Sequence, residues 1–243
     1  MARFHLAADA WGADAALTGD EARHLTQVLR MKVGERIFVF DGVGRRASAE
    51  ILSVSRERVP LRLGEIQPSR APLPAITLAQ AIPKGKNMDL IVQKAVELGI
   101  FAIQPLVTRN TVVQPGDGKS LKWRRNALEA CKQCGQDRLP DIADPQNFEA
   151  WLATQSAVGG LKLIASLAEG ALPLRETLRR HPGTRAVTLL VGPEGDFSPQ
   201  ESAAAVAAGF IPVSLGEIVL RVETATIFCL SALRYEFAET GGL

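Results

Sequence analysis

The chain lacks the features that mark membrane proteins and proteins of oxidising compartments. Its 243 residues contain no apolar run approaching the roughly 18 or more residues of a membrane span, and the N-terminus has no apolar core of a signal peptide. There are only 3 cysteines, so at least one is unpaired in a monomer, which favours a reducing compartment. We therefore expect a cytoplasmic protein without a membrane partner.

Metal-binding and nucleophilic motifs are also scarce. Cys131 and Cys134 form a lone C-x-x-C, without a second cysteine pair or a suitably spaced histidine, so we expect packing residues and no metal site. The histidines (His5, His24 and His181) are scattered, and no nucleophile-base motif is evident. The G-x-G-x-x-G and Walker patterns are missing, which argues against an ordinary nucleotide loop.

The chain also has little net charge. The net charge is +2, which by itself is weak evidence for a nucleic-acid partner. The first 70 residues contain 10 arginines and 1 lysine against 9 acidic residues, and the remainder is balanced. Arginine suits phosphate because its planar fork can donate two hydrogen bonds. A solvated surface of mixed charge explains the same composition, and charge alone favours that interpretation.

The N-terminal part has the pattern of short strands. Residues 18–21 (T-G-D-E) form a capping-box pattern that predicts a helix to about residue 31. Apolar runs and alternation at 37–40, 47–51 and 59–63 predict strands of a small sheet or barrel. The proline-rich segment 68–74 has the composition of a linker.

The pattern changes after this linker, and we predict two domains, residues 1–72 and 73–243. Strands alternate with helices in the second, which predicts an α/β fold with a parallel sheet covered on both faces. The predicted strands are 76–82, 100–107, 161–165, 186–191 and 210–214, and the predicted helices include 87–98, 120–134 and 224–237. The last helix is apolar nearly all round, and burial against a second subunit is a natural explanation.

One segment combines a strand, a glycine turn and a marked helix start. After the apolar residues 189–191, the sequence G-P-E-G-D-F-S occupies residues 192–198. Its glycines permit backbone angles closed to other residues and let a ligand approach the main chain. Ser198 with Pro199 and Glu201 forms a capping box with proline at the first helical position. Open α/β sheets bind ligands beyond the carboxyl ends of such strands.

A second segment repeats this arrangement after the next strand. Residues 215–226 read L-G-E-I-V-L-R-V-E-T-A-T, a glycine turn followed by a helix entry that bears Arg221 and Glu223. In this order the two segments resemble the SPOUT RNA methyltransferases, and in particular the ribosomal RNA small subunit methyltransferase E family. That family's patterns are close to G-P-E-G-G-F-S and L-G-x-R-I-L-R-T-E-T-A. The departures here are Asp196, Glu217, Ile218, Val219 and Val222.

The resemblance extends over nearly the whole chain. Residues 84–99 are similar to the family's K-G-x-x-M-D-x-x-x-Q-K-x-x-E-L-G, and residues 129–135 to its E-A-x-x-Q-S/C-G. Residues 24–30 are similar to its H-x-x-x-V-L-R. Several motifs in the same order are far more specific than any one of them.

The resemblance implies a fold and an activity. The fold is a C-terminal parallel-sheet SPOUT domain with a trefoil knot, which dimerises, after a small PUA-like β-barrel that binds RNA. The activity is methyl transfer from S-adenosylmethionine to N3 of a uridine in 16S ribosomal RNA, within the small subunit. Two alternatives are a non-catalytic RNA-binding or ribosome-assembly factor, and an enzyme for a phosphorylated small molecule that uses the helix start at Ser198 as an anion site.

The same resemblance suggests roles for particular residues. Methylating N3 requires a base for its proton and a cation for the charge on the carbonyl oxygens; Arg221 suits the second role, and the base is left open between Glu223 and Glu194. Alternatively, Arg221 and Glu223 pair with each other and Glu194 braces its own loop. The expected cofactor-binding residues are Leu167, Val191, Gly192, Pro193, Glu194, Gly195, Leu215, Gly216, Leu220 and Thr224, where core packing is the alternative for each leucine. The candidate RNA-phosphate contacts are Arg23, Arg30, Lys84 and Lys86, which could equally be solvated surface charges.

Overall fold

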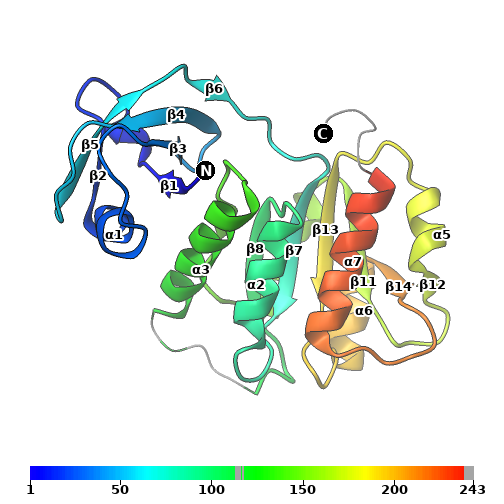
Figure 1. The fold of residues 1–243 in the computed structure, drawn as a ribbon. Helices are drawn as coiled ribbons and strands as arrows, with labels where there is room; N and C mark the ends of the chain where they lie inside the picture. Colours follow the sequence, from blue (N-terminus) through cyan, green and yellow to red (C-terminus); the bar gives the residue numbers. More distant parts are fainter. Residues whose placement is uncertain (113–115, 117, 238–243) are drawn as a thin grey trace. The chain divides into compact units, whose positions relative to one another are not determined.

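The computed structural model describes residues 1–112, 116 and 118–237, and the chain divides into two compact units (Figure 1). The first unit contains Met1–Ala71 together with Leu128–Leu139, and the second contains Pro72–Ala127 and the described residues from Pro140 onward. The division after Ala71 falls one residue before the boundary expected from the sequence. The addition of Leu128–Leu139 to the first unit was not expected.

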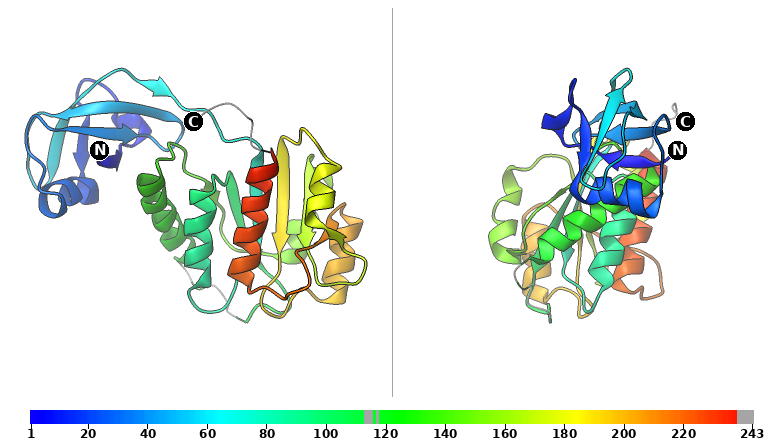
Figure 2. Two further views of the ribbon diagram at one scale, coloured as in Figure 1. Left: turned by 45° about the vertical axis from the view of Figure 1, so that its right-hand side comes forward. Right: turned by 60° about the vertical axis from the view of Figure 1, so that its left-hand side comes forward.

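A curled sheet forms the first unit (Figure 2, blue to cyan). Its strand order is β1-β3-β4-β5-β2, with β6 paired to β4. β1 runs parallel to β3, and the other pairs are antiparallel. The strands are β1 (Arg3–His5), β2 (Ala16–Thr18), β3 (Arg36–Phe40), β4 (Arg45–Ile51), β5 (Arg58–Leu63) and β6 (Gln67–Pro68). Their alternating apolar residues form the core of this unit, as the sequence predicts.

The helix of the first unit is shorter than predicted and is not capped as expected. It comprises α1 (Gly19–Arg23) and one π-helical turn, His24–Val28, and Thr18 makes no side-chain capping hydrogen bond. The predicted capping box is therefore wrong. The Glu21 carboxylate instead accepts a hydrogen bond from the His5 N–H at 3.3 Å and one from Lys132 Nζ at 2.9 Å. The Glu21 side chain, which the local pattern assigned to the helix cap, therefore binds residues distant in the sequence.

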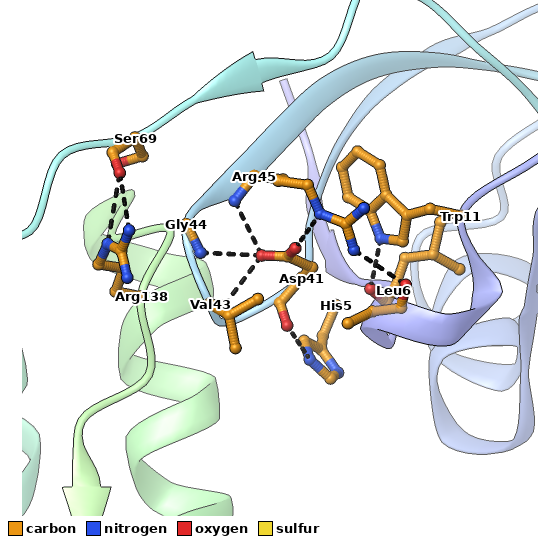
Figure 3. Close-up of polar contacts among 10 residues, drawn as sticks. His5, Leu6, Trp11, Asp41, Val43, Gly44, Arg45, Ser69 and Arg138 are labelled. Carbon is orange, nitrogen blue, oxygen red and sulfur yellow. Dashed lines mark hydrogen bonds and ion pairs between the residues drawn. The ribbon is translucent and has the colours of Figure 1, made fainter.

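A buried carboxylate organises the turn between β3 and β4 (Figure 3). Asp41 is 4% exposed, and its Oδ1 accepts hydrogen bonds from the N–H groups of Val43, Gly44 and Arg45 at 2.9, 2.9 and 2.8 Å. Its Oδ2 accepts one from Arg45 Nε at 2.5 Å. Burial by itself would raise the pKa of Asp41, but these hydrogen bonds outweigh it and hold the pKa below its ordinary value.

Charged residues also fasten Leu128–Leu139 to this unit. Asp137 is 3% exposed and lies 2.5 Å from Arg3 Nη2 and 3.7 Å from Arg46 Nη1. Lys132 pairs with Glu21, an interaction in which both side chains are largely buried. Burial would lower the pKa of Lys132, yet Glu21 and the neighbouring Glu129 raise it. The segment is therefore held by a network of buried charges.

Backbone contacts complete this attachment. The Arg138 guanidinium donates to the carbonyl oxygen of Ser69 at 3.2 and 3.3 Å (Figure 3), and the Leu139 N–H donates to Gly42 O at 2.8 Å. Gly44 has a φ of +113°, and a Cβ there would lie 2.4 Å from Arg138 Nη2. Only glycine fits where this arginine crosses the turn.

The second unit contains the predicted parallel sheet. Its strand order is β10-β8-β7-β13-β11-β14-β12, with β9 paired to β8, and these pairings are all parallel. The strands are β7 (Ala75–Ala81), β8 (Ala102–Val107), β9 (Asp141–Ile142), β10 (Gln146–Asn147), β11 (Leu161–Ala165), β12 (Leu172–Pro173), β13 (Ala186–Val191) and β14 (Ile211–Ser214). The five strands predicted from apolar runs are among them.

Helices cover both faces of this sheet, as predicted. α2 (Asn87–Glu97), α7 (Val222–Phe237) and α5 (Leu174–Arg179) lie side by side on one face, and α6 (Pro199–Ala207) lies on the other (Figures 1 and 2). α4 (Phe148–Leu152) packs with α6 around an apolar cluster. α3 (Lys119–Cys134) crosses the division between the units within a single helix. No helix among the described residues is long and apolar enough to cross a membrane.

Candidate cofactor and active site

A cavity of about 480 Å³ lies at the carboxyl ends of β11, β13 and β14. Its lining comes from residues 165–167, from the loop 191–196, from the segment 215–225 and from Asn87. Parallel strands place their carboxyl ends at one edge of a sheet, so the loops that follow them meet there. The two glycine-turn segments singled out in the sequence therefore form one concave site.

Most of the expected cofactor residues line this cavity. Gly195 and Thr224 are outside the lining, and the other eight of the ten are in it. The expectation missed Asn87, Ala165, Ser166, Ile218, Val219, Val222 and Ala225. Ile218 and Val219 are 78% and 71% exposed. Two adjacent apolar residues in a glycine turn could have been predicted to line a binding site. From the sequence they were noted only as departures from the family motif.

Two glycines let the main chain form the wall of the cavity. Gly216 has a φ of +119°, in the region that favours glycine. A Cβ on Gly192 would lie 3.0 Å from Asp196 Oδ1 and 3.2 Å from Phe197 Cε2. A side chain at Gly216 would strain the turn, and one at Gly192 would displace its neighbours, so the main chain itself lines the cavity at both positions.

The predicted capping box at the start of α6 is present, and it closes that helix end. Ser198 Oγ accepts from the Glu201 N–H at 3.3 Å, and Glu201 Oε2 accepts from the Ser198 N–H at 2.8 Å. Glu201 is 4% exposed, and its Oε1 accepts from the Arg109 N–H at 2.8 Å. The chain's own buried carboxylate therefore occupies this helix start, which argues against the alternative of an anion site at Ser198.

The loop after β13 is also anchored by the segment that follows β8. Asn110 Nδ2 donates to the carbonyl oxygens of Gly195 and Asp196, both at 2.9 Å. Asp196 has a φ of +54°, which explains why glycine suits this position. Its Oδ1 accepts from the Phe197 N–H at 2.8 Å, and burial raises the pKa of this carboxyl despite that bond. Asp196 thus presents a half-buried carboxyl to the cavity.

The other two acidic side chains of the cavity each have one hydrogen-bond donor. Glu194 Oε1 accepts from the Lys84 N–H at 2.9 Å, and Glu223 Oε2 accepts from Asn87 Nδ2 at 3.1 Å. Arg221 also lines the cavity and is exposed. Within the described ranges, its side chain forms no hydrogen bond or ion pair. The expected alternative in which Arg221 pairs with Glu223 is therefore wrong.

A buried polar contact fixes the first turn of α7 beneath the cavity. Thr226 Oγ1 donates to Gln80 Oε1 at 2.7 Å, and both residues are 0% exposed. Gln80 Nε2 in turn donates to Ala81 O at 3.0 Å and to Val191 O at 3.5 Å. Because α7 bears Glu223 and follows Arg221, this contact sets the position of both side chains relative to the sheet.

The candidate RNA contacts divide between the two units. Lys84 and Lys86 are exposed in the segment that leads from β7 to α2, next to the cavity residue Asn87. In the first unit, Arg23 pairs with the exposed Asp20 at 3.3 Å, and Arg30 is exposed with a φ of +53°. All four side chains are accessible to solvent.

Neither the cysteines nor other side chains form a metal site in the described part of the chain, where no group of three or more His, Cys, Asp or Glu residues has suitable geometry. Burial raises the pKa of the Cys131 thiol to about 12. The protonated thiol therefore persists at neutral pH, which agrees with a packing role for this residue.

Comparison with known proteins assigns the chain to a class. The model of the RNA methyltransferase domain matches residues 69–234, and the model of the RNA methyltransferase PUA domain matches residues 17–63. The chain therefore has the two domains of an RNA methyltransferase with a PUA-like N-terminal sheet. Ribosomal RNA small subunit methyltransferase E of Synechocystis sp. is 32% identical over 221 residues, which cover 91% of this chain and 73% of that protein. The chain belongs to the ribosomal RNA small subunit methyltransferase E family, as its motifs predict.

Solved structures agree over the whole chain. The family member from Neisseria gonorrhoeae, bound to S-adenosyl methionine, is 30% identical, with a TM-score of 0.85 and 98% of each chain covered. A methyltransferase from Legionella pneumophila in complex with the cofactor SAM is 32% identical, with a TM-score of 0.84 and 96% of each chain covered.

Proposed function

We propose that this protein transfers the methyl group of S-adenosylmethionine to N3 of a uridine in 16S ribosomal RNA of the small subunit. The observation that carries the proposal is the cavity that the two glycine-turn segments form together. The Neisseria and Legionella relatives were solved with S-adenosylmethionine, which supports the same cofactor here. A non-catalytic scaffold would have no use for a formed cavity whose arginine has no side-chain partner among the described residues.

The residues present fit this cofactor. Leu167, Leu215 and Leu220 offer apolar surface for an adenine ring, and Gly192 and Gly216 line the same cavity without side chains that would fill it. A volume of about 480 Å³ is in the range of small-molecule sites. When bound, S-adenosylmethionine supplies an electrophilic methyl group on a positively charged sulfur.

Arg221 is assigned to charge stabilisation. As N3 of uridine loses its proton, negative charge spreads to the carbonyl oxygens on either side of it. A guanidinium placed there in advance lowers the barrier without reorganising at the moment of reaction. Arg221 meets this requirement because it lines the cavity and has no side-chain partner among the described residues.

Glu223 is the stronger candidate for the base. The Asn87 amide fixes its Oε2 at 3.1 Å and leaves the other oxygen available to accept a proton. Glu194 is exposed and accepts the Lys84 N–H, which suits a brace between two loops. We therefore expect Glu223→Gln to reduce turnover more than Glu194→Gln, whereas the reverse order would exchange the two roles.

RNA binding is assigned to the basic residues of both units. The PUA-like unit presents Arg23 and Arg30, and the cavity segment presents Lys84 and Lys86. Removing these charges together should weaken RNA binding and flatten its dependence on salt, because fewer counterions are released. An unchanged slope would contradict the assignment.

The proposal also includes the oligomeric state and the cellular compartment of the protein. We expect a homodimer in the cytoplasm, formed through the knotted SPOUT domain. The exposure of Phe228 (47%) and Tyr235 (89%) on α7 supports an interface on that helix. Sedimentation would measure the oligomeric state, and a monomer at micromolar concentration would contradict this part.

The decisive experiment is methyl transfer from labelled S-adenosylmethionine to small ribosomal subunits that lack the modification. Digestion and mass spectrometry should identify N3-methyluridine at a single site. Cofactor binding is measured separately by calorimetry. Binding without transfer would direct the search to other RNAs, whereas neither binding nor transfer would overturn the proposed activity.

A further inference from the structure

A second cavity, of about 470 Å³, lies at the opposite edge of the sheet in the second unit. It is lined by residues 160–162, by the segment 181–186, and by Gly209 and Ile211. These residues precede or begin β11, β13 and β14, whose carboxyl ends form the cofactor cavity. A parallel strand of this length separates the two sites by on the order of 15 Å. The second cavity is therefore distinct from the proposed active site.

Lys162 is the central feature of this cavity. It lies on β11 and is only 9% exposed, yet its ammonium group meets no carboxylate in the part of the chain described. Nζ donates to Gln155 O at 2.5 Å and to Ala208 O at 3.4 Å. Neutral carbonyl groups do not balance a buried positive charge, and proteins normally pair such charges. The ammonium also has a third donor that these two contacts do not use.

Two further basic side chains line the same cavity. Arg185 is exposed, and its guanidinium has no hydrogen bond or ion pair within the described ranges. His181 Nδ1 donates to Thr177 O at 2.8 Å, since a carbonyl can only accept, so Nε2 of the neutral ring is an acceptor that fits a phosphate hydroxyl but not an unprotonated phosphate oxygen. The described lining contains no Asp or Glu. Among the described residues, the cavity therefore combines a buried cation that no carboxylate balances with the free guanidinium of Arg185.

We propose that this cavity is a binding site for a phosphate group. The planar fork of Arg185 suits two parallel hydrogen bonds to phosphate oxygens, and Lys162 supplies a charge that water screens poorly. The phosphate comes from an RNA backbone or from a small phosphorylated compound, which share this chemistry. The proposal does not depend on the methyl-transfer reaction, because no residue of this cavity lines the cofactor site.

Thermal unfolding in phosphate tests the site. Inorganic phosphate should raise the melting temperature above that in chloride at equal ionic strength, because a ligand of the native state stabilises it. In Arg185→Ala, the phosphate concentration for half the effect should rise roughly tenfold, as expected for loss of a charge-assisted pair. Arg179→Ala is the matched control, because it removes the same charge from an exposed residue outside the lining. This control should behave as the wild type.

The outcomes decide between specific binding and general ion effects. If phosphate gives no gain over chloride, or if Arg185→Ala and Arg179→Ala respond equally, the proposal is overturned. Lys162→Met provides a second variant, in which a phosphate response equal to that of the wild type would also overturn it.

RNA binding identifies the source of the phosphate. A reduced salt dependence of RNA affinity in Arg185→Ala, by about one counterion relative to Arg179→Ala, would identify the RNA backbone. If Arg185→Ala weakens the response to inorganic phosphate but leaves the salt dependence of RNA affinity unchanged, the source is a small phosphorylated ligand.

Discussion

The two units use charge in opposite ways. In the first unit, the buried carboxylates of Asp41 and Asp137 each meet an arginine, and Lys132 meets Glu21. Around the cofactor cavity of the second unit, Arg221 has no partner among the described residues, and Asp196 has only a backbone N–H. Charges that are neutralised within the chain hold the fold together. Charges left without a counterion in a cavity are available to a ligand, although they cost stability.

The largest effect is expected where a free charge of the cavity is removed. Arg221→Ala should lower methyl transfer by roughly a hundredfold or more, because the negative charge that develops on uridine loses its partner. Cofactor affinity and melting temperature should stay near the wild type, since Arg221 supports no other described side chain. Single-turnover assays and calorimetry measure the two quantities. Near-normal transfer in this variant would remove Arg221 from the mechanism.

An effect of comparable free energy, on stability and not on turnover, is expected in the first unit. Asp137→Asn should lower the free energy of unfolding by about 3 kcal/mol, because Arg3 remains mostly buried without a negative partner. Methyl transfer at low temperature should persist. Asp20→Asn is the control, because its ion pair is exposed and should contribute about 0.5 kcal/mol or less. Urea unfolding that shows equal losses for both variants would contradict the contrast between the units.

Asp41 links the stability of the first unit to pH. Its folded-state pKa is lowered, so its contribution is complete above the unfolded pKa and is lost as pH falls through the folded value. Asp41→Asn should be less stable than the wild type at pH 7 by about 1–3 kcal/mol. The difference in the free energy of unfolding between the wild type and this variant should shrink below about pH 4, where Asp41 is protonated in the unfolded chain. A difference that is constant between pH 7 and pH 3 would exclude this linkage.

The smallest expected effect concerns Asp196. Its ionised carboxylate should favour the positively charged S-adenosylmethionine over the neutral product S-adenosylhomocysteine. Asp196→Asn should therefore reduce the ratio of the two affinities a few-fold at pH 7. Because burial raises the pKa of Asp196, this difference should disappear as pH falls, beginning above the ordinary pKa of an aspartate. Calorimetry with both compounds measures the ratio, and an equal change in both affinities would show a purely steric role.

Local signals in the sequence were enough to predict the parallel sheet and most of the cavity. The glycine turns and the Ser198 capping box depend on neighbouring residues, so their patterns can be read without knowing the fold. The residue assignments made for the cavity stay predictions until variants are measured. Homodimer formation and the knot stay predictions as well.

The features missed by sequence analysis depend on residues far apart in the chain. Glu21 was assigned to a helix cap but pairs with Lys132, which lies 111 residues away. Asp137 meets Arg3 across 134 residues. Asn87 enters the cavity from the helix after β7, 136 residues from its partner Glu223. No local pattern encodes such pairings, because Glu, Asp and Asn residues are mostly found on solvated surfaces, and their presence in a sequence does not indicate a distant partner.

The discontinuity of the first unit has a consequence for its synthesis. Residues Met1–Ala71 leave the ribosome well before Leu128–Leu139, which supplies the partners of Arg3 and Glu21. At elongation rates of about 5–20 residues per second, the intervening residues take roughly 3 to 11 seconds to emerge. During that interval the nascent β-rich unit has an incomplete charge network, while β7, α2 and β8 of the second unit are already being made. The N-terminal unit is the first to begin but cannot be completed until the chain has passed its midpoint.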